Sequence, residues 1–398
     1  MCNVAFLSFD ANENHGGVQR VSFLLAKGFS KKGIKSFLIY DKVASEPSTC
    51  YDGKLLYKGV EDNDKLEQFL KNNSIKYVIN NCVVKSVRTG GEIKDILDRC
   101  GCKLISIIHA KPDLIKVTPS VYSLKWAMKR TQSIATKFVL VFKLLIFPLY
   151  KQYSNKKYIS WRKCIYENSS KIVVLSKYYV DCFCNMLKVD DSKVLSISNP
   201  LNFDYTCSED DINKKCNEVL IVSRLEESAK GLSRVFKAWK IVEQASNNSN
   251  WRLTIVGSGE DMEYYQKLCL KLDLKRVKFE GHKNPFEYYQ RAKIFIMSSF
   301  HEGLPMTLLE AEQMGLAVVA INNFESLQEL VIDGANGFLV ENKEECIARK
   351  LQDLMANPDL CKKFAISSVK NSKLFSPHLV VEKWIQLFKT LKDENITN

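Results

Sequence analysis

The stretch IFIMSSFHEGLPMTLLEAEQMG, residues 294–315, joins a strand, a polar loop and a helix. The apolar run Ile294–Ser298 predicts a buried strand. Pro305 stands where the helix begins, because proline is well tolerated at the first helical position. Gly315 can end that helix. A strand followed directly by a helix is the repeating unit of an α/β protein with a parallel sheet.

The rest of the chain repeats this alternation of short apolar runs with longer periodic stretches. In the first half the predicted strands are Val4–Phe9, Ser36–Tyr40, Tyr77–Asn80, Lys103–Ile108, Ile172–Leu175 and Val194–Ile197, and the predicted helices are Gly17–Lys32, Asp62–Lys71, Glu92–Arg99 and Lys177–Leu187. In the second half the strands are Val219–Arg224, Arg252–Val256, Val277–Phe279, Ile294–Ser298, Ala317–Ile321 and Gly337–Val340, and the helices are Ser233–Ala245, Asp261–Leu272, Pro285–Arg291, Pro305–Met314, Lys343–Ala356 and Pro377–Lys392.

The length of 398 residues suits two α/β domains better than one core. Asn199-Pro200 interrupts the pattern, and a polar stretch follows. We therefore predict one domain over 1–199, a second over 200–376, and a last helix within 377–398 that packs back toward the first. The fold expected is a pair of doubly wound, Rossmann-like domains. Facing across a cleft, they would bring together the carboxyl ends of their strands, where open α/β sheets bind ligands, but the sequence alone does not establish that they face one another.

The composition is that of a soluble globular protein, with 46% hydrophobic and 26% charged residues. Thirteen cysteines are present, but their spacing matches no zinc motif. The chain runs from Met1 straight into a strand without a secretory signal. We therefore expect reduced, structural thiols and a cytoplasmic protein.

The net charge of +13 is concentrated in one segment. Between Asp113 and Glu167 there is no acidic residue and there are eleven basic ones, so the remaining 47 basic residues nearly balance the 45 acidic ones. A local excess of this kind favours a local anionic partner, such as a membrane surface, over a nucleic-acid groove along the chain.

The same segment contains the apolar run Phe138–Tyr150, interrupted by Lys143 and Pro148. It is shorter than the ~20 residues that a spanning helix needs. We expect residues of about 114–166 to attach the protein peripherally to the inner face of the plasma membrane. The alternative is a core helix with a solvated basic face, which Pro148 would kink.

Residues 300–312 carry the clearest sign of chemistry. Thr307, Leu308 and Leu309 would lie in the first turn of the helix, where free N–H groups and the helix dipole attract a phosphate. Glu302 precedes the helix and Glu310 lies more than one turn inside it. Two acids so placed could bind the hydroxyls of two sugars on either side of a diphosphate. The plainer alternative is a loop glutamate and an exposed helical one.

The two glutamates, with seven residues between them in a loop reading His-Glu-Gly-Leu-Pro, resemble the E-x7-E motif of the retaining GT-B glycosyltransferases (family 4-like, group 1). Further motifs follow in that family's order: His15-Gly16-Gly17-Val18, His109 after a strand, Val173-Val174-Leu175-Ser176, Ser198-Asn199-Pro200, Ser223-Arg224-Leu225 with Lys230-Gly231, Ile255-Val256-Gly257-Ser258-Gly259, Phe279-Glu280-Gly281-His282, Asn336-Gly337-Phe338-Leu339-Val340 and Phe375-Ser376-Pro377. The ordered set is far more specific than any one of them.

The resemblance implies a role for each position. Arg224 and Lys230 would face the leaving diphosphate, where fixed cations lower the barrier. Glu310 would bind the ribose, Glu302 the transferred sugar, and His109 the sugar near the reacting carbon. The other donor-binding positions implied are Gly16, Gly17, Ser223, Gly257, His282, Gly303, Leu304, Thr307 and Leu308. The plainer alternatives are surface charge for the cations, a buried core histidine and a tight glycine turn.

Two features depart from the commoner family pattern. Ser223 stands where glycine is usual, and one extra residue separates Arg224 from Lys230. Gly257-Ser258-Gly259 lacks the third glycine and the later acid of a dinucleotide fingerprint, which argues against an oxidoreductase. Asp62-Asn63-Asp64 is the only D-x-D sequence and stands before a helix, more like a cap than a metal site.

The function implied is retaining, metal-independent transfer of a hexose or N-acetylhexosamine from a nucleotide sugar, UDP-linked by expectation. The acceptor would be a polyprenyl-diphosphate-linked or other glycan in surface polysaccharide biosynthesis, with no cofactor and no nucleic-acid partner. Two alternatives stay open: a sugar-nucleotide epimerase of the same fold, and a non-catalytic nucleotide-sugar-binding protein.

Overall fold

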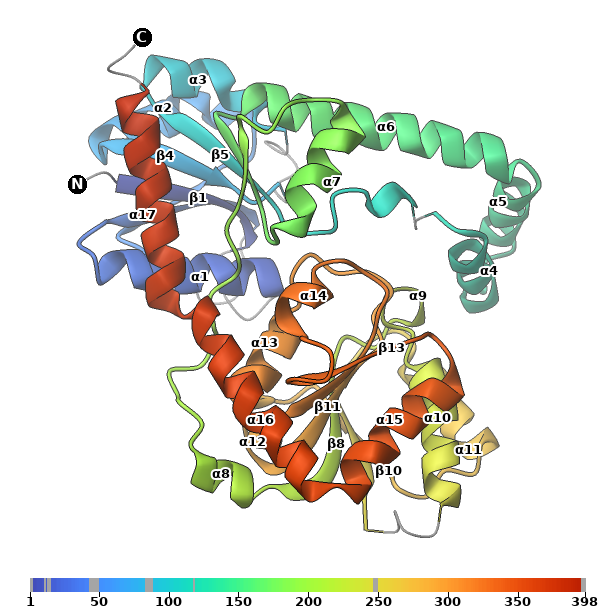
Figure 1. Ribbon diagram of the computed structural model, residues 1–398. Helices are drawn as coiled ribbons and strands as arrows, with labels where there is room; N and C mark the ends of the chain where they lie inside the picture. The colour runs from blue at the N-terminus through green and yellow to red at the C-terminus, as the bar shows by residue number, and fades with distance from the viewer. Residues whose placement is uncertain are drawn as a thin grey trace. The chain divides into compact units, whose positions relative to one another are not determined.

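The computed structural model describes residues 3–10, 12, 16–42, 50–82, 89–116, 119–245 and 250–394. The chain divides into two compact units, one of Met1–Pro200 with Pro377–Asn398 and one of Leu201–Ser376. Each unit is built on a parallel β-sheet with helices on its faces (Figure 1). His15, which belongs to one of the sequence motifs, lies outside the described residues.

The sheet of the first unit has the strand order β3-β2-β1-β4-β5-β6-β7 in the described residues. These strands are β1 (Asn3–Asp10), β2 (Ser36–Lys42), β3 (Gly53–Leu56), β4 (Ile75–Asn80), β5 (Lys103–Ile108), β6 (Lys171–Val174) and β7 (Val194–Ser196). Val4, Ala5, Phe6 and Leu7 are fully buried one after another. This continuous burial, without alternation, is typical of a parallel strand covered by helices on both faces.

The helices of the first unit mostly cover this sheet. They are α1 (Gly17–Ser30), α2 (Asn63–Asn72), α3 (Lys94–Arg99), α4 (Val121–Arg130), α5 (Ile134–Leu145), α6 (Phe147–Asn168), α7 (Tyr178–Leu187) and α17 (Pro377–Asp393). The last helix, α17, packs on α1. Gly28 permits this, because a Cβ there would lie 2.5 Å from Val381 Cγ2.

The second unit has the strand order β10-β9-β8-β11-β12-β13 in its described part. The strands are β8 (Cys216–Val222), β9 (Arg252–Val256), β10 (Val277–Gly281), β11 (Ala292–Met297), β12 (Ala317–Ile321) and β13 (Gly337–Val340). The helices are α8 (Glu209–Asn213), α9 (Glu227–Lys230), α10 (Ser233–Gln244), α11 (Met262–Lys271), α12 (Phe286–Arg291), α13 (Met306–Gln313), α14 (Leu327–Leu330), α15 (Glu344–Ala356) and α16 (Pro358–Ser372).

In each sheet, later strands are added on both sides of the first strand of the unit, β1 or β8. The direction reverses between β1 and β4 in the first sheet and between β8 and β11 in the second. Such a switch point leaves a crevice at the carboxyl ends of the two strands, which is where open α/β sheets bind ligands. The loops after β1, β4, β8 and β11 are therefore the places to look for a site.

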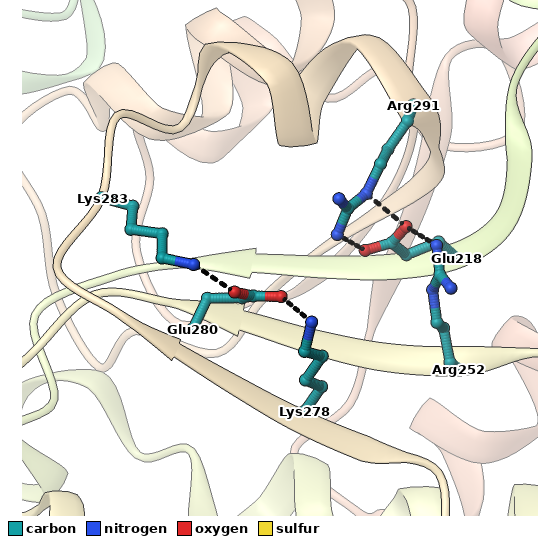
Figure 2. A network of polar contacts seen from close by, with 6 residues as sticks. All are labelled: Glu218, Arg252, Lys278, Glu280, Lys283 and Arg291. Carbon is teal, nitrogen blue, oxygen red and sulfur yellow. Dashed lines mark hydrogen bonds and ion pairs between the residues drawn. The ribbon is translucent and has the colours of Figure 1, made fainter.

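A buried carboxylate ties the amino end of the second sheet together. Figure 2 shows Glu218 of β8 between Arg252 and Arg291. Arg291 donates to both carboxylate oxygens at 2.8 and 2.9 Å, and Arg252 donates at 2.9 Å. Burial opposes the charge of Glu218, but these hydrogen bonds outweigh it and the pKa of Glu218 is lowered. A fully desolvated carboxylate is tolerated here because both oxygens are paired.

The structure corrects the sequence analysis of residues 121–168. Pro148 does not kink a helix but lies in the first turn of α6, where its missing N–H costs nothing. The apolar run is split between α5 and α6. In α5 the buried residue is Leu140 alone, so α5 is not a core helix. None of the described helices is both long enough and apolar enough to span a bilayer.

Candidate active site

Two loops meet at the switch point of the second sheet. The loop after β8 runs from Ser223 into α9, and the loop after β11 runs from Ser298 to Pro305. Ala229 accepts a hydrogen bond from Phe300 N at 2.9 Å, and the Lys230 carbonyl accepts one from Ser298 Oγ at 2.7 Å. These bonds hold the two loops together along their backbones.

Lys230 and Glu302 form an ion pair across these loops. Each side chain is about four-fifths buried, at 19% and 20% exposure. Gly231 follows Lys230 with φ +57° and ends α9, so the ammonium group is carried on a short helix whose end is fixed. Both residues are predicted from the sequence as site residues, and the structure brings them into contact.

Arg224 lies apart from this pair. Its side chain is 70% exposed, and its Nε lies 3.2 Å from Glu226 Oε2. The sequence analysis expected Arg224 and Lys230 to act together. In this structure each has its own carboxylate partner, and the Arg224 side chain has room to move because most of it is in solvent.

The helix α13 begins directly after Glu302. Leu308 and Leu309 N–H both donate to the Pro305 carbonyl at 3.2 Å. The N–H groups of Met306 and Thr307 make no hydrogen bond within the described part of the chain. The anion-binding capacity of this helix start therefore rests on Met306 and Thr307, while Gly303 and Leu304 are buried beneath it.

Glu310 is buried, at 7% exposure, and is not the exposed helical residue of the plainer alternative. Its Oε1 accepts from Asn202 Nδ2 at 2.7 Å and its Oε2 accepts from Tyr289 OH at 2.9 Å. Burial, and then the neighbouring Glu310 carboxylate, raise the pKa of Tyr289 far above its usual range.

The glycines after β9, Gly257 and Gly259, lie against the backbone of the loop after β8. A Cβ on Gly257, whose φ is +139°, would lie 1.9 Å from the Ser223 carbonyl oxygen, and one on Gly259 would lie 2.3 Å from that of Leu225. The loops after β8 and β9 therefore approach each other as closely as glycine allows. This close contact requires glycine at positions 257 and 259.

His282 follows β10 on an exposed loop. Its neighbour Glu280 lies between Lys278 and Lys283 at 2.6 and 2.7 Å (Figure 2). Hydrogen bonds from these two lysines lower the pKa of Glu280 to about 2. The loop that carries His282 is thus held by ion pairs, which leaves the imidazole at the surface.

The first unit places His109 at the end of β5, beside Asn81 at the end of β4. His109 Nε2 lies 2.8 Å from Asn81 Oδ1. Asn81 Nδ2 donates to the Leu7 carbonyl at 2.9 Å and to Ser22 Oγ at 3.0 Å, which fixes the orientation of the amide. Because Asn81 Oδ1 can only accept, His109 must carry its proton on Nε2.

His109 is neutral at physiological pH. Burial, with a smaller contribution from the positive charge of Arg162, lowers its pKa to about 4. Its Nδ1 makes no hydrogen bond within the described residues. The imidazole therefore offers a bare acceptor nitrogen at the carboxyl edge of the first sheet.

Gly16 and Gly17 begin α1 after β1. Gly16 caps the helix with φ +153°, whereas a Cβ on Gly17 would meet nothing within 4 Å. The N–H groups of Gly17, Val18 and Gln19 make no hydrogen bond in the described chain. Gly16 is thus explained by its backbone conformation, and Gly17 leaves open space at an exposed helix start.

Sequence reasoning missed the residues that orient the others. Asn81 holds His109, while Asn202 and Tyr289 hold Glu310. Asn202 lies 108 residues from Glu310 along the chain, so no local pattern could pair them. Asn81 left a weak signal, since Asn80-Asn81 follows a strand directly in the loop of a switch point.

Residues 208–370 match the family model of the glycosyl transferases group 1. The chain is similar to the amylovoran biosynthesis glycosyltransferase AmsD of Erwinia amylovora, at 29% identity over 226 residues, covering 55% of this chain and 62% of that protein. It is also similar to the GalNAc-α-(1→4)-GalNAc-α-(1→3)-diNAcBac-PP-undecaprenol α-1,4-N-acetyl-D-galactosaminyltransferase of Campylobacter jejuni, at 26% identity over 277 residues, covering 65% and 72%.

Solved structures agree over nearly the whole chain. HepE of Anabaena in complex with UDP and glucose superposes with a TM-score of 0.70 at 16% identity, covering 98% of this chain and 100% of that one. A likeness at this identity establishes the fold. The chain has the GT-B fold, with a group 1 glycosyl transferase match in its second unit.

Proposed function

Starting from a GT-B fold whose second unit matches the glycosyl transferases group 1, we propose that this chain is a retaining glycosyltransferase. It transfers a hexose or an N-acetylhexosamine from a UDP-sugar to a lipid-linked or other glycan acceptor in surface polysaccharide assembly. The observation that carries the proposal is the largely buried ion pair of Lys230 and Glu302, which joins the two switch-point loops directly before α13.

The donor diphosphate binds at the start of α13. The N–H groups of Met306 and Thr307 and the helix dipole favour a negative charge there. When no donor is bound, the Glu302 carboxylate neutralises the charge of Lys230. When the donor binds, its diphosphate forms the ion pair with Lys230 instead. Lys230 then stabilises the charge that develops on the leaving group, joined by the mobile, solvent-exposed side chain of Arg224.

The carboxylates position the sugars of the donor. Glu310, oriented by Tyr289 and Asn202, accepts hydrogen bonds from the ribose hydroxyls. Glu302, released from Lys230, accepts from hydroxyls of the transferred sugar. His109 accepts from another sugar hydroxyl through Nδ1, because its Nε2 proton is committed to Asn81. Gly16, Gly17, Ser223, Gly257 and His282 complete the donor-binding set.

The choice of donor and acceptor is supported by similarity. HepE, of the same fold, was solved with UDP and glucose. The related proteins of Erwinia and Campylobacter are named for amylovoran biosynthesis and for an undecaprenol-diphosphate-linked acceptor. An acceptor anchored in the membrane in turn places the enzyme on the cytoplasmic face of the plasma membrane.

Product analysis tests the reaction. Purified protein is incubated with a panel of UDP-hexoses and UDP-N-acetylhexosamines, with and without a polyprenyl-diphosphate-linked glycan, and the anomeric configuration of the new linkage is read by NMR. We expect the donor's configuration to be kept. An inverted linkage would refute retention, an epimerised donor without acceptor would identify an epimerase, and binding without turnover would identify a binding protein.

Metal independence is tested in the same assay. Fixed cations and helix N–H groups balance the diphosphate in this proposal, so excess EDTA should leave transfer intact. The aspartates of the D-x-D sequence start α2, and Asp62 Oδ1 lies 2.7 Å from Lys65 Nζ. Loss of activity in EDTA, with recovery in Mn²⁺ or Mg²⁺, would overturn this part of the proposal.

A further inference from the structure

The connection between β5 and β6 is a helical extension made of α4, α5 and α6, residues 121–168. The carboxyl-terminal part of α6 packs near β5 and α7, and its other end carries α5 and α4 away from the sheet (Figure 1). At 1.5 Å per residue, the 22 residues of α6 span about 33 Å. Because α6 is this long, α4 and α5 lie well away from the sheet of the first unit.

α5 presents an apolar stripe to solvent. The stripe consists of Ile134, Phe138, Val141, Phe142 and Leu145, spaced i, i+4, i+7, i+8 and i+11, which places all five on one face of the helix. Ile134, Phe138 and Leu145 are 72%, 71% and 77% exposed. Leu140, the buried residue of α5, lies on a different face. The stripe is therefore turned away from the helix that α5 packs against.

Contiguous exposed apolar surface of this kind marks an interaction site, whereas single exposed residues are ordinary. Leu149 and Tyr153 extend the exposed apolar surface into the start of α6, at 66% and 65% exposure. Elsewhere in the described chain, residues such as Val60 and Leu270 are equally exposed but stand alone. Adjacent exposed apolar residues are thus concentrated on the helical extension.

All three helices of the extension carry exposed basic side chains. They are Lys125, Lys129, Arg130, Lys137, Lys156, Lys157 and Lys163. Lys129 Nζ lies 5.3 Å from the Trp126 ring centre, and Lys143 Nζ lies 5.1 Å from that of Tyr150. The segment between Asp113 and Glu167 contains no acidic residue.

We propose that the helical extension docks on an anionic phospholipid bilayer, with the apolar stripe of α5 inserted at the level of the headgroups and the surrounding cations bound to lipid phosphates. An exposed apolar stripe on a segment with many exposed basic side chains matches such a surface, because long basic side chains reach the headgroups while the aromatic and aliphatic groups enter the acyl boundary. The proposal stands independently of the transfer reaction.

The extension is rigidly joined to the loop that carries His109. Tyr158 OH donates to the Pro112 carbonyl at 2.9 Å. Arg162, 4% exposed, donates to the same hydroxyl through Nε at 3.1 Å and through its terminal nitrogen at 2.9 Å. Docking of α5 would therefore set the orientation of the whole first unit, with its His109 edge, relative to the bilayer.

Co-sedimentation with vesicles tests the proposal. The full-length protein should bind vesicles of phosphatidylcholine mixed with phosphatidylglycerol, bind pure phosphatidylcholine much less, and dissociate in high salt. The charge variant Lys125→Glu/Lys129→Glu/Arg130→Glu/Lys137→Glu should lower the partition coefficient at least roughly 100-fold, since each basic group near an anionic leaflet contributes about fivefold. The stripe variant Ile134→Ser/Phe138→Ser/Leu145→Ser should lower it at least roughly tenfold.

Matched controls carry the same changes elsewhere. Val60→Ser/Leu270→Ser/Leu374→Ser alters three apolar residues of 80%, 79% and 60% exposure outside the extension. Lys35→Glu/Lys188→Glu/Lys240→Glu/Lys363→Glu removes four exposed lysines outside it. Both controls should bind anionic vesicles almost as well as the unchanged protein.

Any of the following results would overturn the proposal. Absence of binding to either vesicle would exclude a bilayer as the occupant of the stripe, and equal binding to neutral and anionic vesicles would exclude the proposed contacts with anionic headgroups. A dimer that the stripe variant converts to a monomer, measured by light scattering, would identify a second copy of the chain. A fall in melting temperature in the stripe variant but not in its control would show that the stripe packs within the chain.

Discussion

Asn81 fixes the tautomer of His109 by accepting a hydrogen bond from Nε2 over 2.8 Å. The two residues end neighbouring strands, and Asn81 is itself held by Leu7 of β1 and Ser22 of α1. Asn81, which follows β4 at the switch point of the first sheet, thus holds the neutral imidazole at the end of β5 in one orientation. The acceptor nitrogen Nδ1 is the group left for chemistry.

We predict that His109 stays neutral until the pH falls to about 4, because burial and the nearby Arg162 oppose its charge. The stability linked to this group is fully present above pH 6.5 and is lost as the pH falls toward 4, since the unfolded chain binds the proton more readily. Asn81→Asp should raise the pKa by placing a carboxylate beside the ring, and Arg162→Met should raise it by removing a positive charge. NMR titration of the ring nitrogens measures this, and a midpoint near 6.5 in the unchanged protein would contradict it.

A second prediction concerns Glu312, which is fully buried in α13. Asn336 and Asn371 donate to its oxygens at 2.8 and 3.1 Å, but burial outweighs these bonds and raises its pKa well above 4.5. The folded protein therefore loses stability as the pH rises from 4.5 through the folded pKa. Glu312→Gln should remove this decline, which melting temperatures measured across pH would reveal. Parallel curves for the two proteins would show that Glu312 is ionised when folded.

A third prediction compares two glycines of positive φ. Gly281, with φ +74°, has no atom within 4 Å of the place that a Cβ would occupy, so Gly281→Ala should cost only the conformational strain of about 1 kcal/mol. Gly257→Ala must in addition displace the Ser223 carbonyl, which would lie 1.9 Å from the new Cβ. We expect Gly257→Ala to cost roughly 3 kcal/mol or more. Thermal unfolding of the two variants measures the difference, and equal melting temperatures would refute the close contact.

The sequence predicted the parallel α/β elements well where apolar runs were continuous. Lys103–Ile108, Arg252–Val256, Ala317–Ile321 and Gly337–Val340 have the predicted bounds. β3 (Gly53–Leu56) was missed, because a four-residue edge strand containing glycine and lysine has neither a continuous apolar run nor clear alternation. α16 was missed as well, since its apolar residues are interspersed with serine and lysine.

The candidate site was predictable in its chemistry but not in its contacts. Glycines, acids and cations at strand ends identified the loops, yet the pairing of Lys230 with Glu302 joins residues 72 positions apart. The burial of Glu310 depends on Asn202 and Tyr289, which reach it from other elements. Such contacts follow from the sheet topology and from loop packing, which local sequence patterns do not encode.

The central claim, that Lys230 at the switch point of the second sheet binds the diphosphate of a nucleotide donor, is tested most directly by calorimetric titration with UDP. The account predicts that UDP binds the unchanged protein and that Lys230→Ala weakens binding roughly tenfold to 100-fold, the range for a hydrogen bond to a charged group. Lys237→Ala, which removes an exposed lysine of the same unit paired with Glu344 at 3.2 Å, should leave the Kd unchanged. Equal UDP affinity in all three proteins would contradict the account.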